Sequence, residues 1–160
     1  MLAALALYFV ATCSGGAPIE VCPTPAPGTP QEEVLQRVQE DADFDVLYPC
    51  TVPGAQQLAS GTITGEDGRQ QAELVFSGPF DLTIRQSQIP PAVGPDPAGA
   101  SRRVIDLFPN VRATLIEIND GSGDAQYHYF WERDGIFYEV QAVGPPLQER
   151  AIRQVATSLQ

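Results

Sequence analysis

The stretch QYHYFWERDGIFYEVQAV, residues 126–143, decides the fold that the sequence predicts. Gln126 to Arg133 and Ile136 to Val143 are both rich in aromatic and β-branched residues, and Asp134-Gly135 stands between them. An Asp-Gly pair between two such runs is a strong signal of an antiparallel hairpin with a two-residue turn. The sequence therefore predicts two paired strands in its C-terminal third.

An aromatic row lies along the first of these strands. By the two-residue period of a strand, alternate side chains share one face of a sheet, and here these are Tyr127, Tyr129 and Trp131. On a curved sheet such a row is a candidate ligand groove. Packing beneath a helix is the alternative, and it is the commoner use of such a row.

Further strands flank this hairpin on its N-terminal side. A turn at Gly65-Glu66-Asp67-Gly68 separates two alternating segments, with Leu58, Ile63, Leu74 and Phe76 expected to point inward. The predicted strands upstream of the C-terminal hairpin are Gln57 to Thr64, Gln70 to Phe76, Phe80 to Gln86, Arg103 to Leu107 and Val111 to Ile118.

Two helices bracket the strands. Thr29 as N-cap, Pro30 at the first helical position and Glu32 at the third predict a helix that runs to about Ala42. After Gly144-Pro145-Pro146, an apolar stripe predicts a final helix, and its residues are Leu147, Ala151, Ile152, Val155 and Leu159. We therefore expect an α+β domain, a curled antiparallel sheet of about six or seven strands with an N-terminal and a C-terminal helix packed on one face.

Two connections contain proline. The segment from Phe44 to Pro49 predicts a short strand or an extended plug. The segment from Ser87 to Ser101 has four prolines and predicts a long surface loop. We interpret this loop as a passive connection, with a functional loop as the alternative.

Composition excludes several classes of function. The 160 residues carry 20 Asp and Glu against 9 Lys and Arg, a net charge of −11 that argues against a nucleic-acid surface. The chain has one histidine, His128, and three cysteines. This small number of His and Cys residues excludes most zinc sites and most catalytic triads that use a histidine. No partnered nucleophile accompanies His128 in the sequence, so we expect no catalytic residues, no metal and no cofactor.

The N-terminus predicts export. Residues 2–12, LAALALYFVAT, form an apolar run that is too short to span a membrane but has the length of the core of a signal peptide. Val10-Ala11-Thr12-Cys13 resembles the lipobox of bacterial lipoproteins, which implies cleavage after residue 12 and a lipid on Cys13. The alternatives are an ordinary secretory signal cleaved nearby and a buried N-terminal helix.

Residues 13–28 predict a lipid-anchored tether, because prolines and glycines are frequent there and apolar residues are few. Outside the cytoplasm the two remaining thiols, Cys22 and Cys50, form an even set that could pair in a disulfide. Two independent thiols are the alternative. The predicted organisation is a signal peptide at 1–12, a tether at 13–28 and one α+β domain at 29–160.

The C-terminal third also resembles a known family. Phe130-Trp131-Glu132-Arg133-Asp134-Gly135-Ile136-Phe137-Tyr138-Glu139-Val140, followed by a helix ending Ala156-Thr157-Ser158-Leu159, is similar to the pattern of an uncharacterised bacterial domain family, domain of unknown function 4367. Phe44 to Pro49, with Val52-Pro53-Gly54, resembles the entry segment of that family. The resemblance implies an exported domain found in lipoproteins and in membrane-bound regulators, and it supplies no catalytic residues.

Together these features predict an extracytoplasmic lipoprotein, palmitate-modified and anchored to the cell membrane by lipid, with a non-catalytic binding or accessory domain. Its expected partners are the membrane, through the anchor, and either an envelope protein or an apolar ligand. The first alternative is an exported sensor or regulatory domain that acts on an envelope or anti-sigma system. The second is a secreted hydrolase, for which a nucleophile with its base would be needed.

Overall fold

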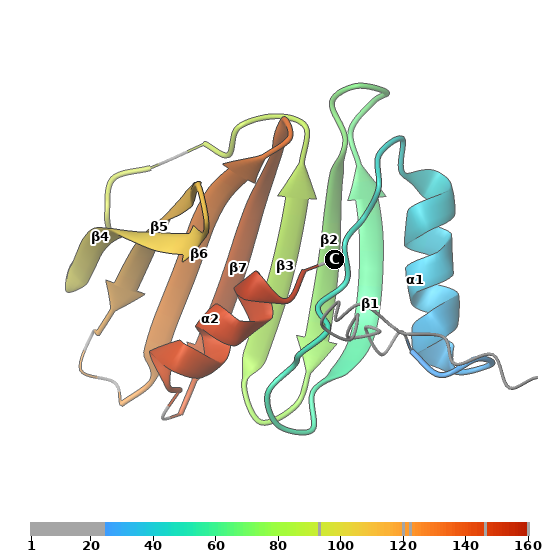
Figure 1. The fold of residues 1–160 in the computed structure, drawn as a ribbon. Coiled ribbons are helices and arrows are strands. Elements are labelled where there is room, and N and C mark those ends of the chain that lie inside the picture. The colour runs from blue at the N-terminus through green and yellow to red at the C-terminus, as the bar shows by residue number, and fades with distance from the viewer. Residues whose placement is uncertain (1–24, 93, 120, 122, 146, 160) are drawn as a thin grey trace, which may run out of the picture.

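A computed structural model describes residues 25–92, 94–119, 121, 123–145 and 147–159 of the chain. Within these residues, two helices bracket seven strands (Figure 1). In chain order the elements are α1 (Pro30–Asp41), β1 (Gln57–Thr64), β2 (Gln71–Ser77), β3 (Asp81–Ser87), β4 (Ala100–Phe108), β5 (Val111–Ile118), β6 (Ala125–Arg133), β7 (Ile136–Gly144) and α2 (Glu149–Thr157).

The strands form one open antiparallel sheet in the order β1-β2-β3-β7-β6-β5-β4. Two meanders, β1 to β3 and β4 to β7, meet where β3 pairs with β7. The predicted hairpin of residues 126–143 is confirmed as β6 and β7, and Asp134 and Gly135 both adopt positive φ in its turn. This is the backbone that a two-residue turn of this kind requires.

Both helices pack on one face of the sheet, as predicted. One row of paired residues runs across that face, and its members are Leu115, Tyr129, Val140, Ile84, Leu74 and Gly61. At one end of the row, a Cβ on Gly61 would lie 2.4 Å from Val38 of α1. Toward the other end, the Tyr129 hydroxyl donates to the carbonyl of Glu149 in α2 over 3.3 Å. We call this side the helix face and the opposite side the outer face.

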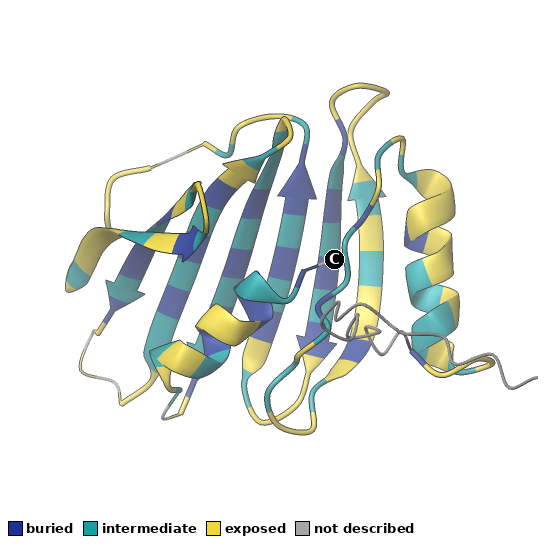
Figure 2. Cartoon of the chain, in the orientation of Figure 1, coloured by how far each residue is buried: buried dark blue, intermediate teal, exposed yellow. Residues whose placement is uncertain are grey.

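The core lies between the helices and the sheet. Along the central strands, buried and half-buried residues alternate, which Figure 2 shows as alternating bands. Leu58 and Ile63 both face the core, as predicted, although they are five positions apart, an odd number that would place them on opposite faces of a regular strand. A β-bulge between Leu58 and Ser60 shifts the register and makes this arrangement consistent with the period of a strand.

The first helix begins as the sequence predicts. The Thr29 hydroxyl accepts from the Glu32 amide over 3.3 Å, and the Glu32 carboxylate accepts from the Gly28 amide over 2.5 Å. Three predicted boundaries differ by two residues or more. The strand expected at Arg103 begins at Ala100. The final helix runs from Glu149 to Thr157, so Leu147 and Leu159 of the apolar stripe lie outside it.

The connection of residues 42–56, here called the crossing segment, runs between α1 and α2 over the helix face (Figure 1). It is the extended plug that the sequence offered as one of two alternatives, with a single bridge from Pro49 to Leu159. Glutamine side chains replace strand pairing. The buried Gln86 amide accepts from the Leu47 N–H over 2.8 Å and donates to the Leu47 carbonyl over 2.7 Å. Gln39 likewise contacts Phe44 and Val46.

Candidate functional site

A charged row crosses the middle of the outer face. Arg85 on β3 lies between two carboxylates, with its Nε 2.6 Å from Glu73 on β2 and its guanidinium 3.2 Å from Glu139 on β7. The strand register brings these residues together, because Glu73 pairs with Arg85 and Arg85 with Glu139. The arginine is therefore neutralised by its own neighbours.

His128 on β6 lies at the end of this row, as a strand residue. Its Nδ1 is 3.8 Å from Glu139, while its Nε2 is buried and has no hydrogen-bond partner among the described residues. Burial is the largest effect on the pKa of His128 and lowers it, the nearby Arg85 lowers it too, and Glu139 raises it. The ring of Phe130 lies 6.1 Å from the imidazole. We therefore describe His128 as a neutral imidazole at neutral pH.

The titration of His128 predicts a pH dependence of stability. Because its pKa is lowered in the folded chain, the free energy of unfolding is unaffected by it above about pH 6.5 and falls as the pH drops from there toward the folded-state pKa. A single proton contributes a slope of at most about 1.4 kcal/mol per pH unit. Urea unfolding of His128→Gln should show a shallower slope below pH 6.5 and the wild-type slope above pH 7. Identical slopes for the two chains at every pH would contradict this assignment.

The proline-rich connection between β3 and β4 forms a cavity on the outer face. The cavity has a volume of about 220 Å³ and lies between the loop and strands β4, β5 and β6. Its floor is apolar, because Ile116 and Phe130 supply it, with Thr114 beside them. Prolines of the loop supply the opposite wall, and these are Pro91, Pro95 and Pro97. We call this space the loop cavity.

An ion pair closes the rim of the loop cavity. The Arg102 guanidinium on β4 binds both carboxylate oxygens of Asp96 in the loop, with its Nε 3.0 Å from Oδ2. The hydrogen bond from Arg102 lowers the pKa of Asp96. Both charges at the rim are thus paired with each other, and the rest of the lining is mostly apolar.

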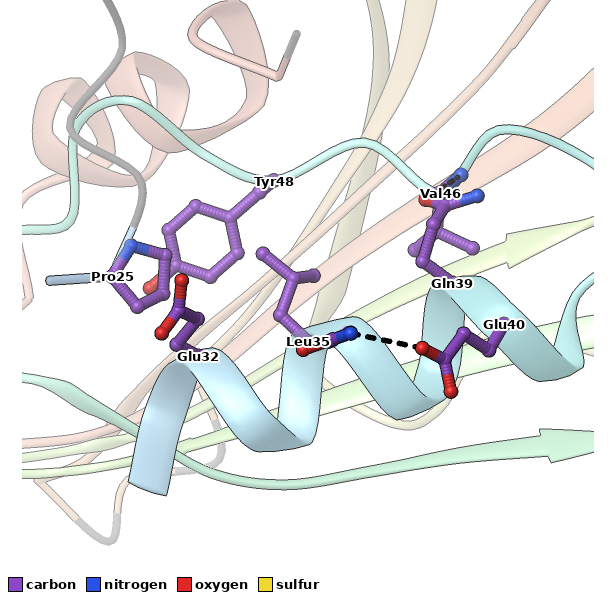
Figure 3. Close-up of a pocket in the computed structure, with 8 residues that line it drawn as sticks. Pro25, Glu32, Leu35, Gln39, Glu40, Val46 and Tyr48 are labelled. Carbon is purple, nitrogen blue, oxygen red and sulfur yellow. Dashed lines mark hydrogen bonds between the residues drawn. The ribbon is translucent and has the colours of Figure 1, made fainter. Parts of the chain in front are cut away.

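A second concave region lies between α1 and the crossing segment (Figure 3). It has a volume of about 490 Å³, and Leu35, Val46, Tyr48 and Pro25 supply its apolar atoms. Its polar side chains already have partners within the chain, since Gln39 binds the crossing segment and Gln36 donates to Glu40 over 2.9 Å.

The structure places the predicted aromatic row in the core. Tyr127, Tyr129 and Trp131 are 7%, 0% and 6% exposed, and they lie on the helix face. Trp131 stacks on Tyr138 at 5.2 Å, and burial raises the pKa of Tyr129. These positions correspond to the core-packing alternative, so we do not place a ligand along this row.

The predicted lipidation and disulfide sites fall largely outside the described residues. Cys13, Cys22 and the signal peptide lie outside them, as does the tether up to residue 24. Cys50 is described, is half-buried and is disulfide-bonded. Its amide donates to the Ser158 carbonyl over 3.0 Å, which fixes this part of the crossing segment beside the end of α2. The pairing of Cys22 with Cys50 stays a prediction.

No protein-family model, no curated protein and no solved structure matches this chain. Among the described residues, no three His, Cys, Asp or Glu side chains gather closely enough to hold a metal ion. The helices in the described ranges are too short or too polar for any of them to cross a membrane.

The sequence interpretation missed the loop cavity, although a signal for it was present. Leu115 and Ile116 are adjacent in β5 and both are buried, so both faces of the sheet are covered at this point. Two consecutive large apolar residues in a strand otherwise expected to be polar on one face are typical of such double burial. What covers the outer face at Ile116 is the proline-rich loop.

Proposed function

We propose that this chain is an extracytoplasmic lipoprotein, held at the membrane by lipid on Cys13, whose folded domain binds an apolar ligand without transforming it. The apolar run of residues 2–12, the lipobox-like residues that follow it and the proline-rich tether support the anchor. The motif resemblance of the C-terminal third to an exported domain family supports the location. The loop cavity supports the binding role.

The loop cavity is the single observation that carries the binding role. Its lining is apolar apart from Thr114 and the Asp96–Arg102 pair, whose two charges neutralise each other. The rim therefore presents a neutralised ion pair and no net charge to attract a charged ligand. At about 220 Å³ the cavity is smaller than the ~300–1,000 Å³ typical of sites for drug-sized ligands. It therefore suits one neutral apolar group about as large as a single ring system.

The surroundings of His128 favour binding over turnover. Glu139, Arg85 and Phe130 lie near His128, and Gln141 and Ile116 lie across the two strand pairs. None of these five carries a hydroxyl or thiol that the imidazole could activate, and general-base catalysis needs such a group within hydrogen-bond reach. The loop cavity itself is lined by one carboxylate, Asp96, and that carboxylate is bound to Arg102.

Filling the cavity should abolish binding. In Thr114→Phe the new ring would occupy space above Ile116 and Phe130, so we expect the affinity for indole, a neutral ring probe, to fall at least about tenfold. Equilibrium dialysis of labelled indole against the purified full chain measures this affinity.

Thr83→Phe is the matched control. Thr83 is also a half-buried threonine on the outer face, but it lies on β3 and does not line the loop cavity. We expect it to bind indole as the wild type does. The cavity is not the binding site if Thr114→Phe and Thr83→Phe bind equally well, and the proposal fails if the wild type takes up no indole at millimolar concentrations.

A further inference from the structure

Strand β4 is the exposed edge of the sheet. It lies last in the strand order, and among the described strands it hydrogen-bonds to β5 alone (Figure 1). At the opposite edge α1 packs against β1, whereas β4 contacts α2 on the helix face, where Arg103 pairs with Glu149. An edge strand presents a row of backbone N–H and C=O groups that another strand can pair with. Near the end of this row, the Asp106 carbonyl accepts from the guanidinium of Arg153 over 2.5 Å, so a strand that pairs as far as Asp106 has to displace Arg153.

The middle of β4 has little of the usual protection against pairing. Protected edges are short, strongly charged or interrupted by a bulge. In contrast, β4 runs for nine residues and its bulge comes only after Asp106. Its two adjacent arginines are paired within the chain, Arg102 with Asp96 and Arg103 with Glu117 and Glu149. Ser101 to Val104 are all exposed. Val104 is 58% exposed, and with Ile89 it is one of two exposed large apolar residues in the described part of the chain.

The side chains of β4 are complementary to a second copy of the same strand. If two β4 strands pair antiparallel about a two-fold axis at Val104, each Val104 lies opposite its counterpart. Arg102 of each copy then lies opposite Asp106 of the other copy. Arg102 binds Asp96 through Nε and Nη2, so its Nη1 can pair with that second carboxylate, and two opposite-charge contacts form. Moving the axis by one residue to Arg103 would set two arginines opposite each other. The charge pattern therefore favours the register centred on Val104.

We propose that two copies of this chain associate edge to edge through β4, antiparallel and centred on Val104, so that their sheets become continuous. This interface goes beyond the proposed ligand binding and does not depend on it. The net charge of −11 on each copy opposes association. At physiological ionic strength, however, charges more than about 8 Å apart are largely screened, whereas directly opposed Arg and Asp side chains are not.

A cysteine at the two-fold axis tests this geometry. Directly opposite residues of antiparallel strands have Cα atoms about 4.5–5.5 Å apart, within the ~4.4–6.8 Å range of disulfides. In the full chain, mild oxidation of Val104→Cys should therefore give a disulfide-linked dimer, read on a non-reducing gel. The matched control is Thr62→Cys, an exposed position on the opposite edge strand, and it should stay monomeric.

Charge reversal separates a specific interface from a chance collision. In the Val104→Cys background, Arg102→Asp or Asp106→Arg should each lower the cross-linked fraction about tenfold, because two like-charge pairs replace two opposite pairs. The double exchange should restore cross-linking. Asp106→Arg leaves the Asp96–Arg102 pair intact, so its effect does not pass through the loop.

Three results would overturn the proposal. The first is equal cross-linking of Val104→Cys and Thr62→Cys. The second is a double exchange that fails to restore the dimer. The third is a cross-link from position 104 in the membrane fraction to a different protein, which would make β4 a docking edge for another strand.

Discussion

Tyr129→Ala lowers the free energy of unfolding by about 3–5 kcal/mol, the range observed when a large aromatic residue is removed from a core. Tyr129 is fully buried at the centre of the helix face, between Leu115 and Val140 of the neighbouring strands. Its loss leaves a cavity beneath α2 and removes the hydrogen bond to the Glu149 carbonyl. Equilibrium unfolding in urea measures the change.

Tyr129→Phe is the control for this prediction. It keeps the ring and removes only the hydroxyl, whose hydrogen bond to the Glu149 carbonyl is 3.3 Å long, so we expect a loss of about 1 kcal/mol. If the aromatic row lined an open groove instead of the core, Tyr129→Ala would change stability by less than 1 kcal/mol and would instead affect binding. That outcome would falsify the assignment of the row to the core.

Gln86→Leu lowers the free energy of unfolding by about 2–4 kcal/mol. Two backbone groups of Leu47 lose their hydrogen-bond partner, and each unsatisfied buried group costs about 1–3 kcal/mol. Gln86 is fully buried and binds both the N–H and the carbonyl of Leu47. Leucine has a similar volume, so the loss reports the hydrogen bonds more than a cavity. The crossing segment should then show faster amide hydrogen exchange around Leu47 than in the wild type.

Gln36→Leu is the matched control for the amide. Gln36 lies on the exposed side of α1 and donates to Glu40 one turn later, an interaction worth about 0.2–0.5 kcal/mol. We expect its unfolding free energy to stay within about 0.5 kcal/mol of the wild type. Equal effects of Gln36→Leu and Gln86→Leu would mean that the crossing segment is held by apolar contacts and not by the amide of Gln86.

The local parts of the fold could be predicted because their signals are local. Thr29, Pro30 and Glu32 define the start of α1 within four residues, and Asp134-Gly135 defines the turn between β6 and β7. Each signal acts through the backbone conformation or a hydrogen bond of its own neighbours. No such signal exists for the pairing of β3 with β7, which are about fifty residues apart, so the order of the strands could not be predicted.

The candidate site could be predicted only in part for the same reason. His128 was identified as a strand residue, but its place beside Glu139 and Arg85 depends on the register of three strands. The loop cavity depends on how a proline-rich segment folds back over Ile116 and Phe130, which no periodicity describes. The prolines predict that this segment is irregular. The only sign of the cavity floor in the sequence is Ile116, an apolar residue at a position of β5 that would otherwise be expected to be polar.

The crossing segment shows how side chains can replace a predicted strand. Phe44 to Pro49 has the composition of a strand, yet its backbone groups at Leu47 bond to Gln86 and those at Phe44 and Val46 bond to Gln39. Satisfying backbone groups in this way removes the need for a neighbouring strand. The glutamines that do so lie on α1 and β3, so the sequence of the segment itself could not distinguish the two alternatives.

The intact mass of the native protein from the membrane fraction, with fragmentation of its N-terminus, tests the central claim most directly. The proposal predicts a mature chain that begins at Cys13 and carries a lipid on that residue. It also predicts a gain of two hydrogens on reduction, from a disulfide between Cys22 and Cys50. A mature chain with an unmodified N-terminus, recovered in the soluble fraction, would contradict the membrane-anchored lipoprotein that we propose.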